Sequence, residues 1–187
     1  MSKRDERNMK KNIKEKLNKV KLLILDVDGV MTDGRIIMDN DGRELKNFDV
    51  RDGHGIKMIQ RYGIQVAILT GRKSKTVEHR AKDLDIKEVY QKALNKKEIF
   101  EKILLKHSLS DSEVAYMGDD IVDIPVLKSV GFSAAVADAL DIVKKQVDYV
   151  TKNRGGRGAV REICDMILQA QGKWPEIADR YDFQDVL

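Results

Sequence analysis

The feature that most constrains this chain is an apolar run that ends abruptly in acidic residues and glycines. Residues 22–25 read Leu-Leu-Ile-Leu, and residues 26–34 read Asp-Val-Asp-Gly-Val-Met-Thr-Asp-Gly. A short apolar run bounded by turn residues is typical of a buried strand, and open α/β sheets place their ligands just past the carboxyl ends of such strands. Asp26 and Asp28 lie at that edge, although Asp and Gly are also ordinary turn residues after a strand.

Strand-like and helix-like segments alternate after this run. Strand-like runs occur at 65–69, around Val89, and at 114–117, 132–136 and 147–150, whereas helix-like segments occur at 55–62, 73–84, 96–107, 121–130, 138–146 and 157–170. This alternation predicts a Rossmann-like α/β fold, a doubly wound parallel sheet with helices on both faces. Residues 35–50 contain two short runs around Asn-Asp-Gly, which predicts an inserted β-hairpin.

The chain divides into three predicted parts. Residues 1–19 are a basic arm, since the first 20 residues carry eight Lys or Arg and three acids, and we interpret the arm as flexible. Residues 20–172 form the predicted domain, and residues 173–187 form a loosely held tail. Because a lone hairpin is marginally stable in water, the hairpin at 35–50 is expected to pack on the domain or on another copy of the chain.

Composition and charge exclude several classes of function. The chain is 42% hydrophobic and 35% charged, and no apolar run approaches the length of a membrane span, so we expect no membrane insertion. The net charge of +4 is concentrated in the arm, so we expect no nucleic-acid partner. The start lacks the apolar stretch of a secretory signal, and a single Cys fits a reducing compartment, so we expect a cytoplasmic protein.

Acidic residues follow two of the predicted strands. In a parallel sheet these strand ends share one edge, so Asp26, Asp28, Asp119, Asp120 and Asp123 are predicted to converge there. Several ionised carboxylates in one pocket repel each other unless a cation joins them, and an all-oxygen ligand set favours Mg²⁺. The sequence therefore predicts a Mg²⁺ site at this edge of the sheet.

Such a site suits phosphoryl transfer. Asp26 is the candidate nucleophile, which attacks phosphorus to form an aspartyl-phosphate. Asp28 is the candidate acid that protonates the departing alkoxide and the base that then activates water. Thr70, after the strand at 65–69, is expected to donate its hydroxyl group to the phosphoryl oxygens, and Lys96 is expected to supply positive charge.

The order and spacing of four segments then resemble a known superfamily. Asp-Val-Asp-Gly-Val at 26–30, Leu-Thr-Gly-Arg at 69–72, Lys96, and Gly-Asp-Asp-Ile-Val-Asp at 118–123 resemble the four motifs of the haloacid dehalogenase superfamily. Further stretches at 32–34, 48–55, 71–73, 136–139 and 154–162 resemble its capless branch of phosphatases that act on 3-deoxy-D-manno-octulosonate 8-phosphate. The match covers roughly residues 20–172.

This resemblance implies a specific activity. It implies hydrolysis of that sugar acid phosphate, through an aspartyl-phosphate, to the free sugar acid and phosphate in lipopolysaccharide biosynthesis. The Mg²⁺ ligands that it implies are Asp26, the backbone carbonyl of Asp28, and Asp119. It also implies no cap domain, and a homotetramer in which the hairpins form a central barrel and a neighbour's C-terminal segment helps to close the site. The alternatives are a phosphatase of a nine-carbon sugar acid 9-phosphate and an inactive binding protein with the same fold.

Several residues keep two interpretations at this point. Lys96 competes with Lys92 and Lys97, although its position after Asn95 matches the superfamily. Asp120 and Asp123 are expected to support the site, either behind the metal ligands or as acids at a helix start. An arginine among the substrate-binding candidates is either an anion contact or a solvated or salt-bridged surface group. The candidate substrate-binding residues are Thr32, Arg51, Gly71, Arg72, Lys96 and Arg157.

Overall fold

The central sheet has six parallel strands in the order β5-β4-β1-β6-β7-β8. The computed structural model describes the backbone of residues 3–186 and the side chains of residues 11–185. The strands are β1 (Leu22–Leu25), β4 (Gln65–Leu69), β5 (Glu88–Tyr90), β6 (Val114–Gly118), β7 (Phe132–Ala135) and β8 (Tyr149–Val150). The predicted doubly wound parallel sheet is confirmed.

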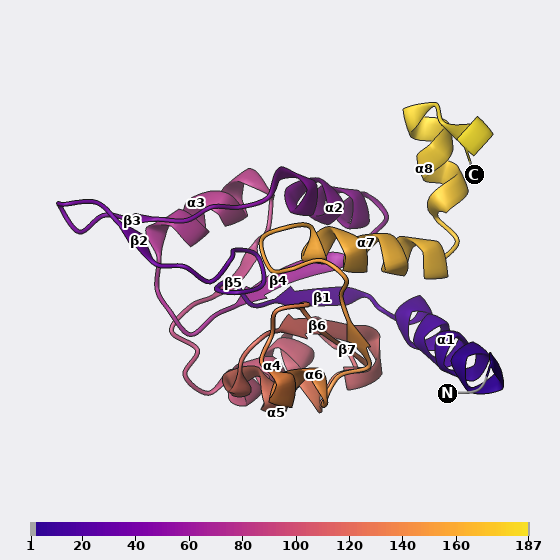
Figure 1. Ribbon diagram of the computed structural model, residues 1–187, viewed down its shortest axis with the longest axis horizontal. Helices are drawn as coiled ribbons and strands as arrows, with labels where there is room; N and C mark the ends of the chain where they lie inside the picture. The colour runs from indigo at the N-terminus through magenta and orange to yellow at the C-terminus, as the bar shows by residue number, and fades with distance from the viewer. Residues whose placement is uncertain (1–2, 187) are drawn as a thin grey trace.

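Helices cover both faces of this sheet (Figure 1). One face carries α2 (Val50–Arg61), α3 (Lys75–Asp83) and α7 (Ala159–Ala170), and the other carries α4 (Lys96–His107), α5 (Ile124–Leu127) and α6 (Asp141–Lys144). Short 3₁₀ turns η1 (Asp111–Glu113) and η2 (Ile121–Asp123) flank β6. Strand β1 lies between β4 and β6 and all four of its residues are buried, which explains why its sequence is continuously apolar.

Helix α2 begins five residues earlier than the sequence predicted. Its first residue is Val50, and the Asp49 side chain caps the helix by accepting a hydrogen bond from the Arg51 backbone N–H. Gly53 and Gly55 lie in its first two turns, and because glycine is common in loops the sequence did not indicate a helix there. Both lie where α2 meets other elements, because a Cβ atom on Gly53 would lie 2.3 Å from Arg80 Nη2 and one on Gly55 would lie 3.1 Å from the Cα atom of Arg161. These glycines therefore permit close packing and do not mark a loop.

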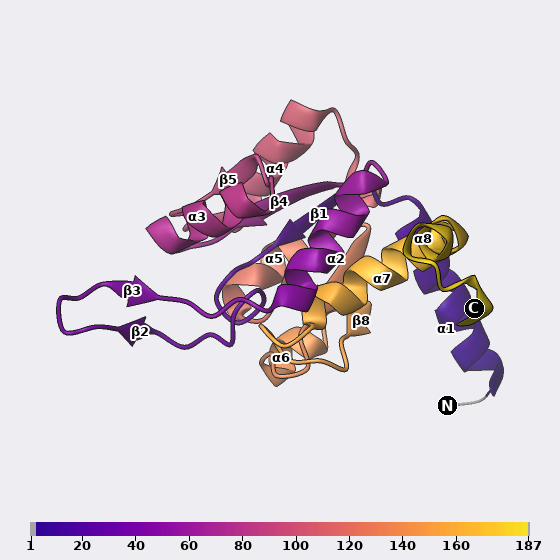
Figure 2. The same ribbon diagram turned by 90° about the horizontal axis from the view of Figure 1, so that it is seen from above.

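The predicted hairpin is also confirmed. Strands β2 (Ile37–Met38) and β3 (Glu44–Leu45) pair antiparallel and reach away from the body of the protein (Figures 1 and 2). Ile36, Met38 and Leu45 on it are 60%, 59% and 55% exposed. In the part of the chain that the structure describes, no cap domain is inserted between the strands of the sheet.

Helices lie at both ends of the described chain, and the flexibility of the arm and of the tail stays a prediction. The first helix, α1 (Lys3–Asn18), buries Leu17 against the core, and the Gln171 side chain donates to the Leu17 and Val20 carbonyls at its end. Helix α8 (Trp174–Tyr181) buries Ile177 and is followed by the 3₁₀ turn η3 (Gln184–Val186). None of the helices in the described residues combines the length and apolarity needed to cross a membrane.

Candidate active site

The carboxyl ends of β1 and β6 bring three carboxylates together. One oxygen each from Asp26, Asp119 and Asp123 lies within 4.8 Å of the others. Asp26 directly follows β1, Asp119 directly follows β6, and Asp123 ends η2. Of the five acids predicted to converge at this edge of the sheet, these three lie together, whereas Asp28 pairs with Lys46 and Asp120 lies exposed at the start of η2.

Asp26 is almost fully buried at this edge. Its Oδ1 accepts a hydrogen bond from the Val27 N–H at 2.7 Å, and its Oδ2 lies 2.8 Å from Lys96 Nζ. Burial raises the pKa of Asp26 from 3.8 to about 6, an effect that the positive charge of Lys96 partly offsets. Burial thus disfavours the ionised form of this carboxylate, and a further cation beside it would stabilise that form.

Lys96 begins helix α4 and joins two of the acids. Its Nζ lies 2.6 Å from Asp123 Oδ1 as well as 2.8 Å from Asp26, and the Tyr116 hydroxyl donates to the same Asp123 oxygen at 2.5 Å. Burial acts to lower the pKa of Lys96, but the charges of Asp26 and Asp123 outweigh it, so the pKa is raised. Lys96 is therefore a fixed ammonium group beside Asp26, whereas Lys97 contacts Ser129 and points elsewhere.

Asp123 supports the site from behind. Its Oδ2 accepts hydrogen bonds from the Asp119 N–H at 2.9 Å and the Asp120 N–H at 3.2 Å, while its Oδ1 is occupied by Lys96 and Tyr116. Asp120 lies on the surface, where its side chain accepts from the Ile121 N–H at the start of η2. Each acid thus fits one of the two interpretations: Asp123 contacts Asp119 and Lys96 from behind the site, and Asp120 caps the start of η2.

Asp119 has the properties of a cation ligand. Its Oδ1 is buried and makes no hydrogen bond with any described residue. Burial, together with the charges of Asp26 and Asp123, raises the pKa of Asp119 to about 8. Gly29, in the loop after β1, has φ +90°, and a Cβ atom there would lie 2.1 Å from Asp119 Oδ2. A side chain at this position would therefore clash with the Asp119 carboxylate. A buried, unpartnered carboxylate oxygen within a cluster of three acids fits a hard cation such as Mg²⁺.

Asp28 points into a separate polar network. Its Oδ1 contacts Lys46 Nζ, and its Oδ2 lies 3.9 Å from Arg72 Nη1. Glu44 on the hairpin lies between these two cations, with its Oε1 at 2.7 Å from Arg72 Nη2 and 3.4 Å from Lys46 Nζ. Arg72 is therefore held beside the acidic loop and is not simply a solvated residue at a helix start.

Thr70, Gly71 and Thr32 occupy the loops around the carboxylates. Thr70 is buried directly after β4, and its backbone N–H and C=O are bonded to Tyr90 and Ala93. Gly71 faces open space, since nothing lies within 4 Å of the position a Cβ atom would take. The buried Thr32 hydroxyl donates to the Val27 carbonyl at 3.3 Å, which ties the loop after β1 into a tight turn.

Known proteins match both the sequence and the fold. A family model described as haloacid dehalogenase-like hydrolase matches residues 85–163. The 3-deoxy-D-manno-octulosonate 8-phosphate phosphatase of Escherichia coli K12 is 52% identical over 161 residues, 86% of each chain. This chain belongs to that phosphatase family.

Solved structures of the family superpose closely on this chain. The Yersinia pestis phosphatase matches with a TM-score of 0.86 and 48% identity, covering 87% of this chain and 88% of that one. The Moraxella catarrhalis phosphatase, solved in complex with magnesium ion, phosphate ion and KDO molecule, matches with a TM-score of 0.89 and 37% identity, covering 90% of this chain and 97% of that one. The resemblance inferred from the motifs is confirmed.

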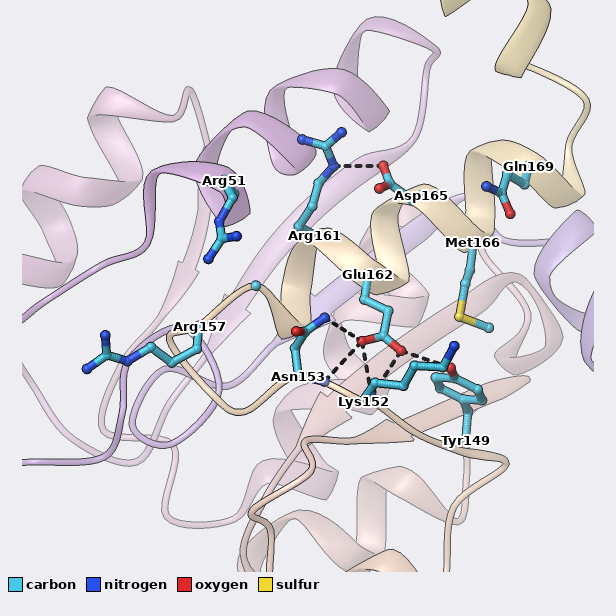
Figure 3. Close-up of a pocket in the computed structure, with 11 residues that line it drawn as sticks. Arg51, Tyr149, Lys152, Asn153, Arg157, Arg161, Glu162, Asp165, Met166 and Gln169 are labelled. Carbon is cyan, nitrogen blue, oxygen red and sulfur yellow. Dashed lines mark hydrogen bonds and ion pairs between the residues drawn. The ribbon is translucent and has the colours of Figure 1, made fainter. Parts of the chain in front are cut away.

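Two other arginines among the candidate substrate-binding residues line a cavity. Arg51 and Arg157 line a cavity of about 380 Å³ along α7, together with Lys152 and Arg161 (Figure 3). Arg51 contacts Asp49 at 3.4 Å, and the exposed Arg157 lies 3.9 Å from Asp33. The described contacts thus place Arg72 beside Asp28 and Arg157 beside Asp33, both in the loop after β1, whereas Arg51 pairs with Asp49.

Sequence reasoning missed Tyr116 and Lys46. Tyr116 lies within the β6 run, where an aromatic residue indicates only a strand, so no local signal distinguishes its role with Asp123. Lys46 follows β3 in a hairpin that looked exposed, yet its side chain is 1% exposed against Asp28. The burial of Lys46 depends on contacts with residues distant in sequence, so the local sequence did not indicate it.

Proposed function

We propose that the protein is a Mg²⁺-dependent phosphatase that hydrolyses 3-deoxy-D-manno-octulosonate 8-phosphate to the free sugar acid and phosphate, in the cytoplasm, as a step of lipopolysaccharide biosynthesis. The observation that carries this proposal is the buried pair of Asp26 and Lys96 beside the unpartnered Asp119 oxygen. Family membership at 52% identity supports the substrate. Residues 20–172 carry all the groups that the reaction needs.

The first step forms an aspartyl-phosphate on Asp26. An Asp26 carboxylate oxygen forms a bond to phosphorus while the bond from phosphorus to the sugar oxygen breaks. Asp28, two residues along the same loop, gives its proton to the departing sugar oxygen. Lys96 Nζ, 2.8 Å from Asp26, neutralises negative charge as it develops, and the Thr70 hydroxyl and the Gly71 backbone N–H are our candidate donors to the phosphoryl oxygens.

The second step releases phosphate. Asp28, now ionised, takes a proton from a water molecule whose oxygen attacks phosphorus, and the bond to Asp26 breaks. Mg²⁺ held by Asp26, the Asp28 backbone carbonyl and Asp119 supplies further positive charge next to the phosphoryl group. Asp123 keeps Asp119 and Lys96 in place throughout. Arg72, beside Asp28, is our candidate contact for the substrate, with Thr32 shaping the loop and Arg51 and Arg157 acting at the periphery.

A homotetramer assembled through the hairpins is the second part of the proposal. The apolar side chains of Ile36, Met38 and Leu45 are more than half exposed on a hairpin that projects from the body, which is the kind of surface that another copy of the chain buries. Light scattering after size-exclusion chromatography measures the mass. A tetramer that Met38→Asp disrupts supports the proposal, and a monomer at micromolar concentration contradicts it.

Phosphate release from three substrates tests the activity. The assay compares 3-deoxy-D-manno-octulosonate 8-phosphate, neuraminate 9-phosphate and an aryl phosphate, each with Mg²⁺ and with a chelator. A strong, Mg²⁺-dependent preference for the first substrate is the expected result. Equal kcat/KM on the first two substrates contradicts the assigned sugar acid, and activity unaffected by the chelator contradicts the metal.

A further inference from the structure

The contacts of Asp28 single out a residue on the hairpin. Lys46 Nζ contacts Asp28 Oδ1, and the Lys46 side chain is 1% exposed, whereas Asp28 itself is 23% exposed. A lysine side chain this deeply buried is rare unless it is paired, because burial of an uncompensated ammonium group is costly. The Lys46 ammonium group therefore has a defined position, and the Asp28 oxygen that it contacts is fixed by it.

The two oxygens of Asp28 have different surroundings. Oδ1 is taken by Lys46, whereas Oδ2 has Arg72 Nη1 at 3.9 Å, beyond hydrogen-bond length, as its cationic neighbour. Among the described residues, no hydrogen bond to Oδ2 is formed. This arrangement leaves Oδ2 as the oxygen available to exchange a proton with the substrate.

The body of the domain holds the base of the hairpin in place. Glu44 Oε1 contacts Lys46 at 3.4 Å and Arg72 at 2.7 Å, and the Thr76 hydroxyl donates to the Glu44 carbonyl at 3.3 Å. Ser74, just before α3, donates to the other carboxylate oxygen of Glu44. Lys46 is thus tied through Glu44 to the loop after β4, and the hairpin base cannot move without disturbing Asp28.

We infer that Lys46 is a positioning residue for the reaction, which holds Asp28 so that its Oδ2 faces the departing sugar oxygen. This inference rests on the proposed acid and base role of Asp28. It assigns the hairpin base a part in the chemistry, in addition to any part in assembly. A misplacement of about 1 Å in a catalytic group is enough to cost a reaction on the order of 100-fold.

The leaving group distinguishes this role from a merely structural one. A sugar alkoxide needs a proton in order to leave, whereas a nitrophenolate leaves without one. Because kcat/KM reports the first chemical step, Lys46→Met is expected to lower kcat/KM roughly 10- to 100-fold on the sugar phosphate and less than about threefold on p-nitrophenyl phosphate. Equal losses on both substrates, or no loss on either, would overturn the inference.

A double-mutant cycle tests whether Lys46 acts through Asp28. In the Asp28→Asn background, Lys46→Met is expected to cause less than about a twofold further loss, because the group that it positions is already gone. Losses that multiply would overturn the inference. The matched control is Lys16→Met, which removes a lysine that pairs with Asp148, directly before β8 and at the opposite end of the strands from Asp28, and which should leave both rates unchanged.

Two further measurements separate the possible failures. If Asp28→Asn itself shows no leaving-group selectivity, the proposed acid role fails and the inference about Lys46 fails with it. If Asp28→Asn is selective and Lys46→Met is not, only the inference about Lys46 is overturned. Should Lys46→Met not fold, Glu44→Gln, which keeps the lysine but weakens its anchor, decides by the same comparison: a selective loss supports the inference, and an equal or absent loss overturns it.

Discussion

Replacement of Lys96 by methionine removes the cation that joins the carboxylates. Lys96 Nζ lies 2.8 Å from Asp26 and 2.6 Å from Asp123, in a place where both partners are buried. Methionine has a similar length and carries no charge, so the substitution leaves the packing nearly unchanged. The main effect is then electrostatic, and it depends on whether the carboxyl groups are ionised.

The sign and size of this effect follow from the two raised pKa values. Burial raises the pKa of Asp26 from 3.8 to about 6 and that of Asp119 from 3.8 to about 8. The fold binds these protons more tightly than the unfolded chain does, so the metal-free protein loses stability as pH rises from about 4 to 8. The Asp26 shift alone corresponds to about 3 kcal/mol. Lys96 lowers both pKa values, so its loss makes this decline steeper.

Denaturation by urea measures the free energy of unfolding of the metal-free protein at two pH values. Lys96→Met is expected to lower it by about 3 to 5 kcal/mol at pH 8, because breaking a buried pair leaves an uncompensated charge, and by roughly half of that at pH 5. The control is Lys97→Met, whose side chain is 38% exposed and which should cost less than about 1 kcal/mol. A loss that is equal at both pH values, or larger at pH 5, would refute the reasoning.

Three other predictions follow from the same contacts. Gly29→Ala should lower both Mg²⁺ affinity and kcat at least about tenfold, because the new Cβ atom would lie 2.1 Å from Asp119 Oδ2 at φ +90°; calorimetric titration and kinetics check it. The apparent Mg²⁺ affinity of the native protein should rise between pH 5 and 8, since protons compete for Asp26 and Asp119; calorimetry at several pH values would contradict this by giving a flat profile. Asp52→Ala should lower the free energy of unfolding, measured with urea, by about 2 to 3 kcal/mol, because the backbone N–H groups of Gly158 and Arg161 lose a buried acceptor at the start of α7. A loss of less than about 0.5 kcal/mol would be inconsistent with that role.

The carboxylate cluster was predictable from sequence because it depends on topology alone. Once the strands alternate with helices, the ends of β1 and β6 must share an edge, and Asp26 and Asp119 follow these strands directly. Topology placed a lysine near this edge, since the predicted helix at 96–107 precedes β6, but it did not choose among Lys92, Lys96 and Lys97. The choice of Lys96 over Lys97 came from its likeness to the superfamily, and the contact with Asp26 agrees with that choice.

Other parts depend on contacts between residues distant in sequence. Lys46 is buried only because the hairpin base folds back over Asp28, and Asp123 acquires its role through Tyr116 and the amides after β6. The start of α2 was missed because its glycines look like a loop unless the packing of α7 and Arg80 against them is known. Helix α1 is mostly polar, so its attachment through Leu17 was not visible in the overall charge pattern.

The measurement that tests the central claim most directly is the site of phosphorylation during turnover. Native protein mixed with 3-deoxy-D-manno-octulosonate 8-phosphate and Mg²⁺, quenched in acid and digested, is examined by mass spectrometry. The account predicts a phosphoryl group on the peptide that contains Asp26, at that residue, and no turnover by Asp26→Asn. A phosphoryl group on another residue, or phosphate release by Asp26→Asn at the native rate, would contradict it.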